Sequence, residues 1–152
     1  MTAVTLTYPD EAVGFVQASE AAGVPAVVSF TVETDGRLPS GHGLREAVGL
    51  VDEQTDHAAL GFMINCAHPS HFEATLRDDG EWLHRIKGIR PNASKMSHAE
   101  LDAADALDDG NPDDLAGRCR DLMQRLPDLD LLGGCCGTDH RHIRAMATAC
   151  LF

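Results

Sequence analysis

Alternation of strand-like and helix-like segments is the feature that most constrains the fold of this chain. Five segments are candidates for strands in a parallel sheet: residues 2–8, 25–32, 58–65, 85–90 and 129–133. Continuous apolar runs mark those at 25–32 and 58–65, whereas the segment at 85–90 is a weaker candidate. A helical segment follows each of the five. This alternation predicts parallel strands with crossover helices, in either an open doubly wound sheet or part of a (β/α)₈ barrel.

The helical segments carry recognisable start signals. Ser97 and Glu100 have the spacing of a capping box, and Asn111 followed by Pro112 opens a longer helix. Thr138 is positioned to cap the last helix. The inward face of that last helix is expected to be Ile143, Met146, Ala147 and Cys150.

Length and charge limit the classes of protein that this chain can represent. Its 152 residues, 43% of them hydrophobic, are sufficient for one domain with a core, and we expect residues 1–152 to form a single domain. The net charge of −12 opposes binding to nucleic acid and to anionic membranes. No apolar run reaches the roughly 20 residues of a membrane helix, and residues 1–10 lack the features of a signal peptide. We therefore expect a cytoplasmic protein.

Three of the five cysteines follow predicted strands. Cys66 ends the strand at 58–65, and Cys135 and Cys136 follow the strand at 129–133. Because the carboxyl ends of parallel strands share one edge, these three thiolates can reach one metal ion. Three protein ligands and one open position are typical of catalytic zinc. Two other cysteines, on apolar helix faces, are interpreted as core residues: Cys119 and Cys150.

Other interpretations of these residues remain open. His68 follows Cys66 by two residues and could be a fourth ligand, although we interpret it as a solvated histidine at a helix start. His140 and His142 are also expected to be solvated. A redox role for the Cys135–Cys136 pair is less favoured, because the CxxC spacing is absent.

Two motifs carry a resemblance to a known family. Asn65-Cys66 after a buried strand, together with the Gly-Gly-Cys-Cys-Gly run at 133–137, is similar to the zinc motif of the homocysteine S-methyltransferase family. Segments 29–38 and 91–94 also resemble family blocks, in the same order, and the likeness covers essentially the whole chain. It implies the C-terminal part of a (β/α)₈ barrel, with five units that correspond to the last five of eight.

The resemblance also implies a reaction and a set of site residues. Zinc, held by Cys66, Cys135 and Cys136, would activate the thiol of homocysteine to accept a methyl group and give methionine. The donor would be a sulfonium or ammonium compound such as S-methylmethionine, S-adenosylmethionine or a betaine. The expected substrate-binding residues lie at strand ends: Asn65, Asn92, Ser29 and Glu33. Backbone capping is the alternative role for each of these four residues.

The family's first three strand–helix units have no counterpart in this sequence. By the resemblance, Thr5 and Thr7 also stand where a glutamate often holds the amino group of homocysteine. The alternative function is therefore a catalytically incomplete, zinc-binding partial barrel. Because five strands leave two unpaired edges, we expect a homo-oligomer or a complementing N-terminal chain rather than a stable monomer.

Overall fold

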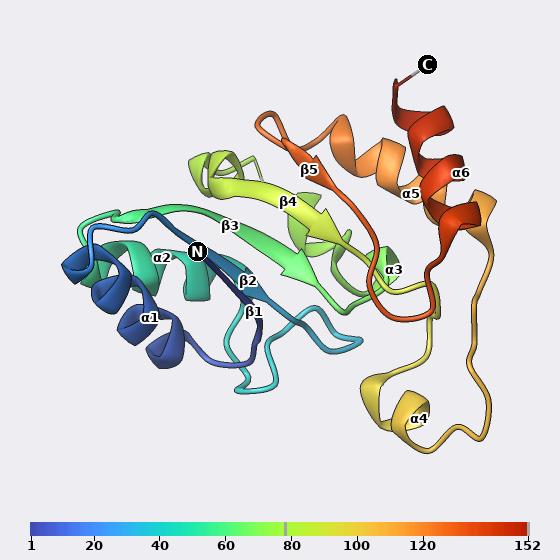
Figure 1. Cartoon of the computed structure of the whole chain (residues 1–152), viewed down its shortest axis with the longest axis horizontal. Coiled ribbons are helices and arrows are strands. Elements are labelled where there is room, and N and C mark those ends of the chain that lie inside the picture. Colours follow the sequence, from blue (N-terminus) through green and yellow to red (C-terminus); the bar gives the residue numbers. More distant parts are fainter. Residues whose placement is uncertain (78, 152) are drawn as a thin grey trace.

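Five parallel strands form one sheet in the computed structural model, which describes residues 1–77 and 79–151 (Figure 1). The strands are β1 (Thr2–Leu6), β2 (Ala26–Phe30), β3 (Ala59–Asn65), β4 (Ile86–Arg90) and β5 (Leu131–Leu132). They lie side by side in chain order, β1-β2-β3-β4-β5. A doubly wound sheet reverses its strand order at a switch point, whereas a barrel does not. The order therefore confirms the prediction of a partial (β/α)₈ barrel.

Helical segments connect the strands, as the sequence predicts. They are α1 (Pro9–Ala21), α2 (Leu44–Gln54), α3 (Pro69–Phe72), α4 (His98–Asp102), α5 (Pro112–Met123) and α6 (His140–Leu151), with short 3₁₀ helices η1 (Thr75–Arg77) and η2 (Glu81–Arg85). The capping box at Ser97 and Glu100 is confirmed, because each residue bonds to the backbone N–H of the other. Asn111 caps α5 by accepting hydrogen bonds from two backbone amides.

Some boundaries differ from the sequence-based expectation. The helical segment that follows the strand at 58–65 is divided into α3 and η1, and η2 was not predicted. α6 begins at His140 rather than beside Thr138, because the Thr138 hydroxyl donates to the carbonyl of Cys135 instead. Ile143, expected to face inward, is 47% exposed, whereas Met146 is buried as predicted.

The main core lies between the sheet and the helices packed on it. The rings of Phe30 and Phe62 stack with their centroids 6.1 Å apart, and the buried side chains of Leu44 and Val48 from α2 belong to the same core cluster. A second, smaller cluster joins α5 to α6 through buried residues that include Leu115. This packing fixes the strands, so the loops at their carboxyl ends are held in defined positions.

An ion pair fixes the opposite, amino end of the sheet. Arg85 forms a bidentate pair with Asp52 of α2, with both distances at 2.8 Å, and also donates to the carbonyl of Ala59. Asp52 is 5% exposed. The pair therefore ties α2 to the starts of β3 and β4. None of the helices in the described residues has the length and apolar character that crossing a membrane requires.

Candidate metal centre

Three cysteine sulfurs meet at the carboxyl end of the sheet. The Sγ atoms of Cys66, Cys135 and Cys136 lie within 4.8 Å of one another, and those of Cys66 and Cys135 are 2.6 Å apart. Two thiolates on one tetrahedral zinc ion, each at about 2.3 Å, are separated by about 3.8 Å. The three sulfurs are close enough to share one ion, although those of Cys66 and Cys135 would have to move apart to bind it. The expected convergence of the three sulfurs is therefore confirmed, and their donor set suits zinc.

The end of β4 brings the two cysteine segments together. The N–H of Cys66 donates to the carbonyl of Arg90, and the N–H of Cys135 donates to the carbonyl of Pro91. The N–H of Ala93 in turn donates to the carbonyl of Cys136. Because β4 lies between β3 and β5, its last residues contact both segments at once. The neighbouring order of the three strands thus places the cysteines.

Asn92 joins the same two segments with its side chain. Its Nδ2 donates to the carbonyl of Cys66 at 3.0 Å, and its Oδ1 accepts from the N–H of Cys136 at 3.1 Å. Asn92 is 3% exposed. Both ends of its amide group are therefore occupied in holding the cysteine loops, although the residue also borders the cavity beside them.

Asn65 supports Cys66 from behind. Its Oδ1 accepts from the hydroxyl of Ser29 at 2.5 Å and from the N–H of Thr5 at 2.9 Å, while its Nδ2 donates to Thr5 Oγ1. Thr5 has φ of 61° and Cys66 has φ of 55°, a left-handed conformation that non-glycine residues rarely adopt. Ser29 and Asn65 are buried. This network fixes the backbone that presents the Cys66 sulfur.

Two glycines allow the second cysteine segment to turn. A Cβ on Gly134 would lie 2.2 Å from the hydroxyl oxygen of Thr138. Gly137 has φ of 77°, and a Cβ there would lie 2.7 Å from the carbonyl oxygen of Asp108. Both positions therefore require glycine if the chain is to pass this closely.

The electrostatics of the cluster favour a bound cation. Burial, together with Cys135, raises the pKa of the Cys66 thiol to about 12. Burial also raises the pKa of Cys136, and the nearby Cys135 adds to this. Burial opposes ionisation of Cys135 too, but hydrogen bonds from Cys66 and Cys136 lower its pKa. One thiolate is thus stabilised by two thiols, and ionising all three requires a positive charge among them.

A cavity of about 540 Å³ opens beside the sulfurs of Cys66 and Cys136. Carboxylate groups from three segments border it: Glu33, Asp102 and Asp108. The residues that line it include no lysine and no arginine. Hydrogen bonds from Ser94 and from the N–H of Gly110 lower the pKa of Asp108, so this group stays ionised. The cavity therefore has an acidic character that suits a cationic ligand.

His98, which no sequence motif indicates, also borders this cavity. Its Nε2 lies 2.7 Å from the carbonyl oxygen of Cys66, and its Nδ1 lies 3.2 Å from Glu33 Oε1. Burial opposes its protonation, but these hydrogen bonds outweigh that effect and raise its pKa. His98 lies 32 residues beyond Cys66 in the sequence, so no local spacing indicates the contact.

Two other histidines differ from expectation. His68 and His142, both interpreted as solvated, are buried. His68 accepts from the N–H of Ser70 and is not part of the sulfur cluster, so it is a helix cap rather than a ligand. The Nε2 of His142 lies 2.8 Å from the carbonyl oxygen of Asp109. A helix cap at His68 and a loop contact at His142 therefore explain why these two side chains are buried.

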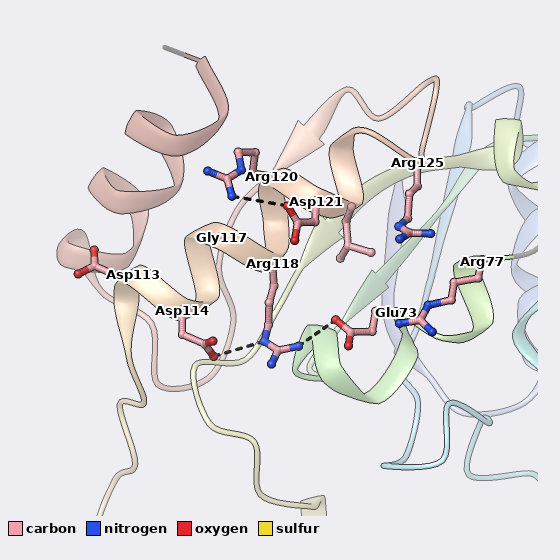
Figure 2. A pocket seen from close by; sticks show the side chains of 10 residues that line it. Glu73, Arg77, Asp113, Asp114, Gly117, Arg118, Arg120, Asp121 and Arg125 are labelled. Carbon is pink, nitrogen blue, oxygen red and sulfur yellow. Dashed lines mark hydrogen bonds and ion pairs between the residues drawn. The ribbon is translucent and has the colours of Figure 1, made fainter.

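A separate groove of about 420 Å³ is lined mainly by charged residues of α5, together with Arg77 of η1 and Glu73, which directly follows α3 (Figure 2). Arg118 lies between Asp114 and Glu73 and pairs with both, at 3.3 and 2.9 Å. No cysteine lines this groove. Its ion pairs connect α5 to α3, and the chemistry-bearing residues lie instead at the strand ends.

Comparisons with known proteins agree with this geometry. The sequence model for homocysteine S-methyltransferase matches residues 1–150. Methionine synthase from Mycobacterium leprae is 32% identical over 127 residues, which cover 83% of this chain and 10% of that protein.

Solved structures show the same fold. The apo form of the homocysteine methyltransferase MmuM from Escherichia coli matches 97% of this chain with a TM-score of 0.62 and 20% identity. The metallated form of MmuM matches equally well. The chain spans 49% and 43% of those two structures, and thus about half the length of these relatives. On the evidence of the family match and the fold, this chain belongs to the homocysteine S-methyltransferase family.

Proposed function

We propose that this chain carries the metal-binding part of a zinc-dependent methyltransferase. The enzyme would transfer a methyl group from a sulfonium or ammonium donor to the thiol of homocysteine, which gives methionine. The observation that carries the proposal is the convergence of three cysteine sulfurs beside an acidic cavity. Membership of the family and the likeness to a methionine synthase support homocysteine as the methyl acceptor.

Zinc fits the donor set, because three thiols at this spacing match the soft ligands and the ligand number of a catalytic site. When bound by Cys66, Cys135 and Cys136, it would deprotonate and orient the thiol of homocysteine at the remaining position. Asn92 would keep the two cysteine loops in register, since its amide group contacts both.

The residues expected to bind substrate differ in whether they reach the cavity. Glu33 borders the cavity, and its carboxylate would attract the ammonium group of homocysteine or a cationic donor. Ser29 and Asn65, expected to contact substrate, are buried behind Cys66 and bond to each other. We propose that these two residues position Cys66 instead. Asn92 contributes through the cysteine loops and borders the cavity at the same time.

A second candidate function follows from the open sheet. We propose that residues 1–152 form one domain, the C-terminal part of a barrel, whose outer edges at β1 and β5 are available to further strand–helix units. Such units could come from a complementing chain or from a second copy. In that case, the chain alone would bind zinc without catalysing methyl transfer.

Zinc content and product formation test the two functions separately. The purified chain, reduced and then exposed to zinc, is expected to retain about one zinc ion per chain. Cys136→Ser is expected to lose the metal, whereas Cys150→Ser, outside the cluster, is expected to keep it. Methionine formation from homocysteine and S-methylmethionine supports the methyltransferase. Zinc binding without methionine supports the incomplete barrel, and failure to bind zinc contradicts both functions.

A further inference from the structure

The carbonyl oxygen of Cys66 is held by an unusual number of donors. Nδ2 of Asn92 lies 3.0 Å away, Nε2 of His98 lies 2.7 Å away and Oγ1 of Thr31 lies 3.4 Å away. A carbonyl oxygen only accepts, so Nε2 of His98 carries the proton in this contact. This oxygen belongs to the peptide group that joins Cys66 to Ala67, and Cys66 itself has a φ of 55°.

Left-handed backbone at a cysteine persists only where surrounding contacts hold it. The contacts to the Cys66 carbonyl come from two directions. Thr31 follows β2, whereas Asn92 and His98 both belong to the connection between β4 and α5. That connection therefore fixes the peptide that determines where the Cys66 sulfur points, and the sulfur lies 2.6 Å from that of Cys135.

His98 also attaches α4 to the strand ends. In Figure 1, α4 lies apart from the sheet, beyond the carboxyl ends of the strands. Among the hydrogen bonds of the described residues, those joining α4 to the strand ends all involve the His98 ring, through Cys66, Thr31 and Glu33. Leu101 and Asp102 of α4 line the cavity. The His98 imidazole thus contacts the loop of Cys66 and also attaches α4, which forms one side of the cavity.

We propose that His98 is a positioning residue of the metal centre, which holds the Cys66 carbonyl and seats α4 over the cavity. The proposal rests on the zinc site of the proposed function. His98 acts through the N–H that its Nε2 donates to the carbonyl oxygen of Cys66. Loss of this donor frees the Cys66 peptide to leave the left-handed region and moves its sulfur away from Cys135. Zinc affinity therefore depends on a side chain that does not touch the metal.

Two substitutions of His98 test this role, because one removes the N–H donor and the other removes the ring but keeps an N–H donor. His98→Leu removes the donor and fills its place with an apolar side chain, whereas His98→Gln keeps an N–H at a similar reach. His84→Leu is the matched control, because His84 lies in η2 at the amino end of the sheet and pairs with Asp128. Zinc affinity is measured on the full chain by competition with a chelating dye. Two further measurements complete the comparison: the near-ultraviolet thiolate-to-cobalt band of the Co²⁺-loaded chain and the thermal unfolding midpoint.

His98→Leu is expected to bind zinc about 10- to 100-fold more weakly than the parent chain, as for other residues that orient a ligand. It should also alter the cobalt band. His98→Gln and His84→Leu are expected to stay within about threefold of the parent, below that range. Equal affinity of His98→Leu and the control would overturn the proposal. If His98→Leu does not fold, His98→Phe, which also lacks the donor, takes its place: zinc binding weaker than that of His84→Leu supports the proposal, and equal affinity contradicts it. A parent chain that binds no zinc refutes the proposed function itself.

Discussion

At the scale of single residues, the cysteine cluster depends on backbone conformations that side chains seldom adopt. Thr5 and Cys66 both have positive φ, and this costs about 1–2 kcal/mol for a residue with a Cβ. Asn65 compensates by bonding to the N–H and the hydroxyl of Thr5. Asn92 compensates by bonding to the carbonyl of Cys66. Two asparagines therefore stabilise the geometry from which the Cys66 sulfur is presented.

Replacement of Asn92 by alanine tests this dependence. The N–H of Cys136 loses its acceptor and the carbonyl of Cys66 loses one of its donors. We expect the free energy of unfolding of the metal-free chain to fall by about 1–3 kcal/mol. Zinc affinity should fall about 10- to 100-fold, because the two cysteine loops lose their bridge. Urea denaturation and dye competition measure the two effects.

Asn111→Ala is the control for this prediction. The Asn111 side chain caps α5 through the N–H groups of Asp113 and Asp114, so its loss is expected to cost about 1 kcal/mol of stability and to leave zinc affinity unchanged. An Asn92→Ala variant that binds zinc as tightly as the Asn111→Ala variant would show that the bridge is not needed for the metal site.

The cysteines could be found from the sequence because their position relative to the strands is local information. Cys66 directly follows an apolar run, and Cys135 and Cys136 lie in a glycine-rich turn. His98 could not be found in this way, because its partners come from other strand ends. Ser29 was correctly placed near the strand end, but sequence alone did not show that its hydroxyl points to Asn65.

At the scale of elements, the inner strands were predicted well, β2 and β3 from continuous apolar runs and β4 from a weaker pattern. β2, β3 and β4 lie within one or two residues of the expected segments, since their burial leaves little freedom of register. β5 has only two paired residues where five were expected, because it lies at the edge and pairs with β4 alone. η2 escaped prediction, since a short 3₁₀ helix has no periodic apolar face.

The ion pair between Arg85 and Asp52 provides a prediction at this scale. Arg85→Leu leaves a carboxylate that is 5% exposed without its main partner, and it also removes a cation from the face of the Phe62 ring. We expect a loss of about 3 kcal/mol in unfolding free energy, at the lower end for a broken buried pair, because His57 remains 3.4 Å from Asp52. Chemical denaturation measures this loss.

Zinc affinity should not change in the Arg85→Leu variant, because the pair lies at the amino ends of the strands and the cysteines lie at the carboxyl ends. Arg120→Leu serves as the comparison. Its pair with Asp121 is exposed, at 54% and 66% for the two side chains, so its loss is expected to cost less than about 1 kcal/mol. Equal destabilisation by the two variants would contradict the assigned role of the Arg85 pair.

At the scale of the whole molecule, the sheet is an arc that does not close. Strand order shows no reversal, and β1 and β5 pair on one side only within the described residues. Val4 in β1 and Leu131 in β5 are 47% and 45% exposed. Apolar side chains on open parallel edges favour pairing with another strand, because the backbone groups at the edge lack partners.

We therefore expect the isolated chain to self-associate through these edges. Sedimentation velocity at rising micromolar concentrations should give a mass above the monomer value of 16.3 kDa. The double variant Val4→Lys/Leu131→Lys should move the mass toward the monomer, since a lysine on an edge strand opposes pairing. Leu107→Lys changes a more exposed leucine, at 77%, that lies outside the sheet, and it should leave the mass unchanged. A parent chain that stays monomeric throughout that range contradicts the prediction. An equal response to the edge and control variants assigns the association to general surface charge instead of the strand edges.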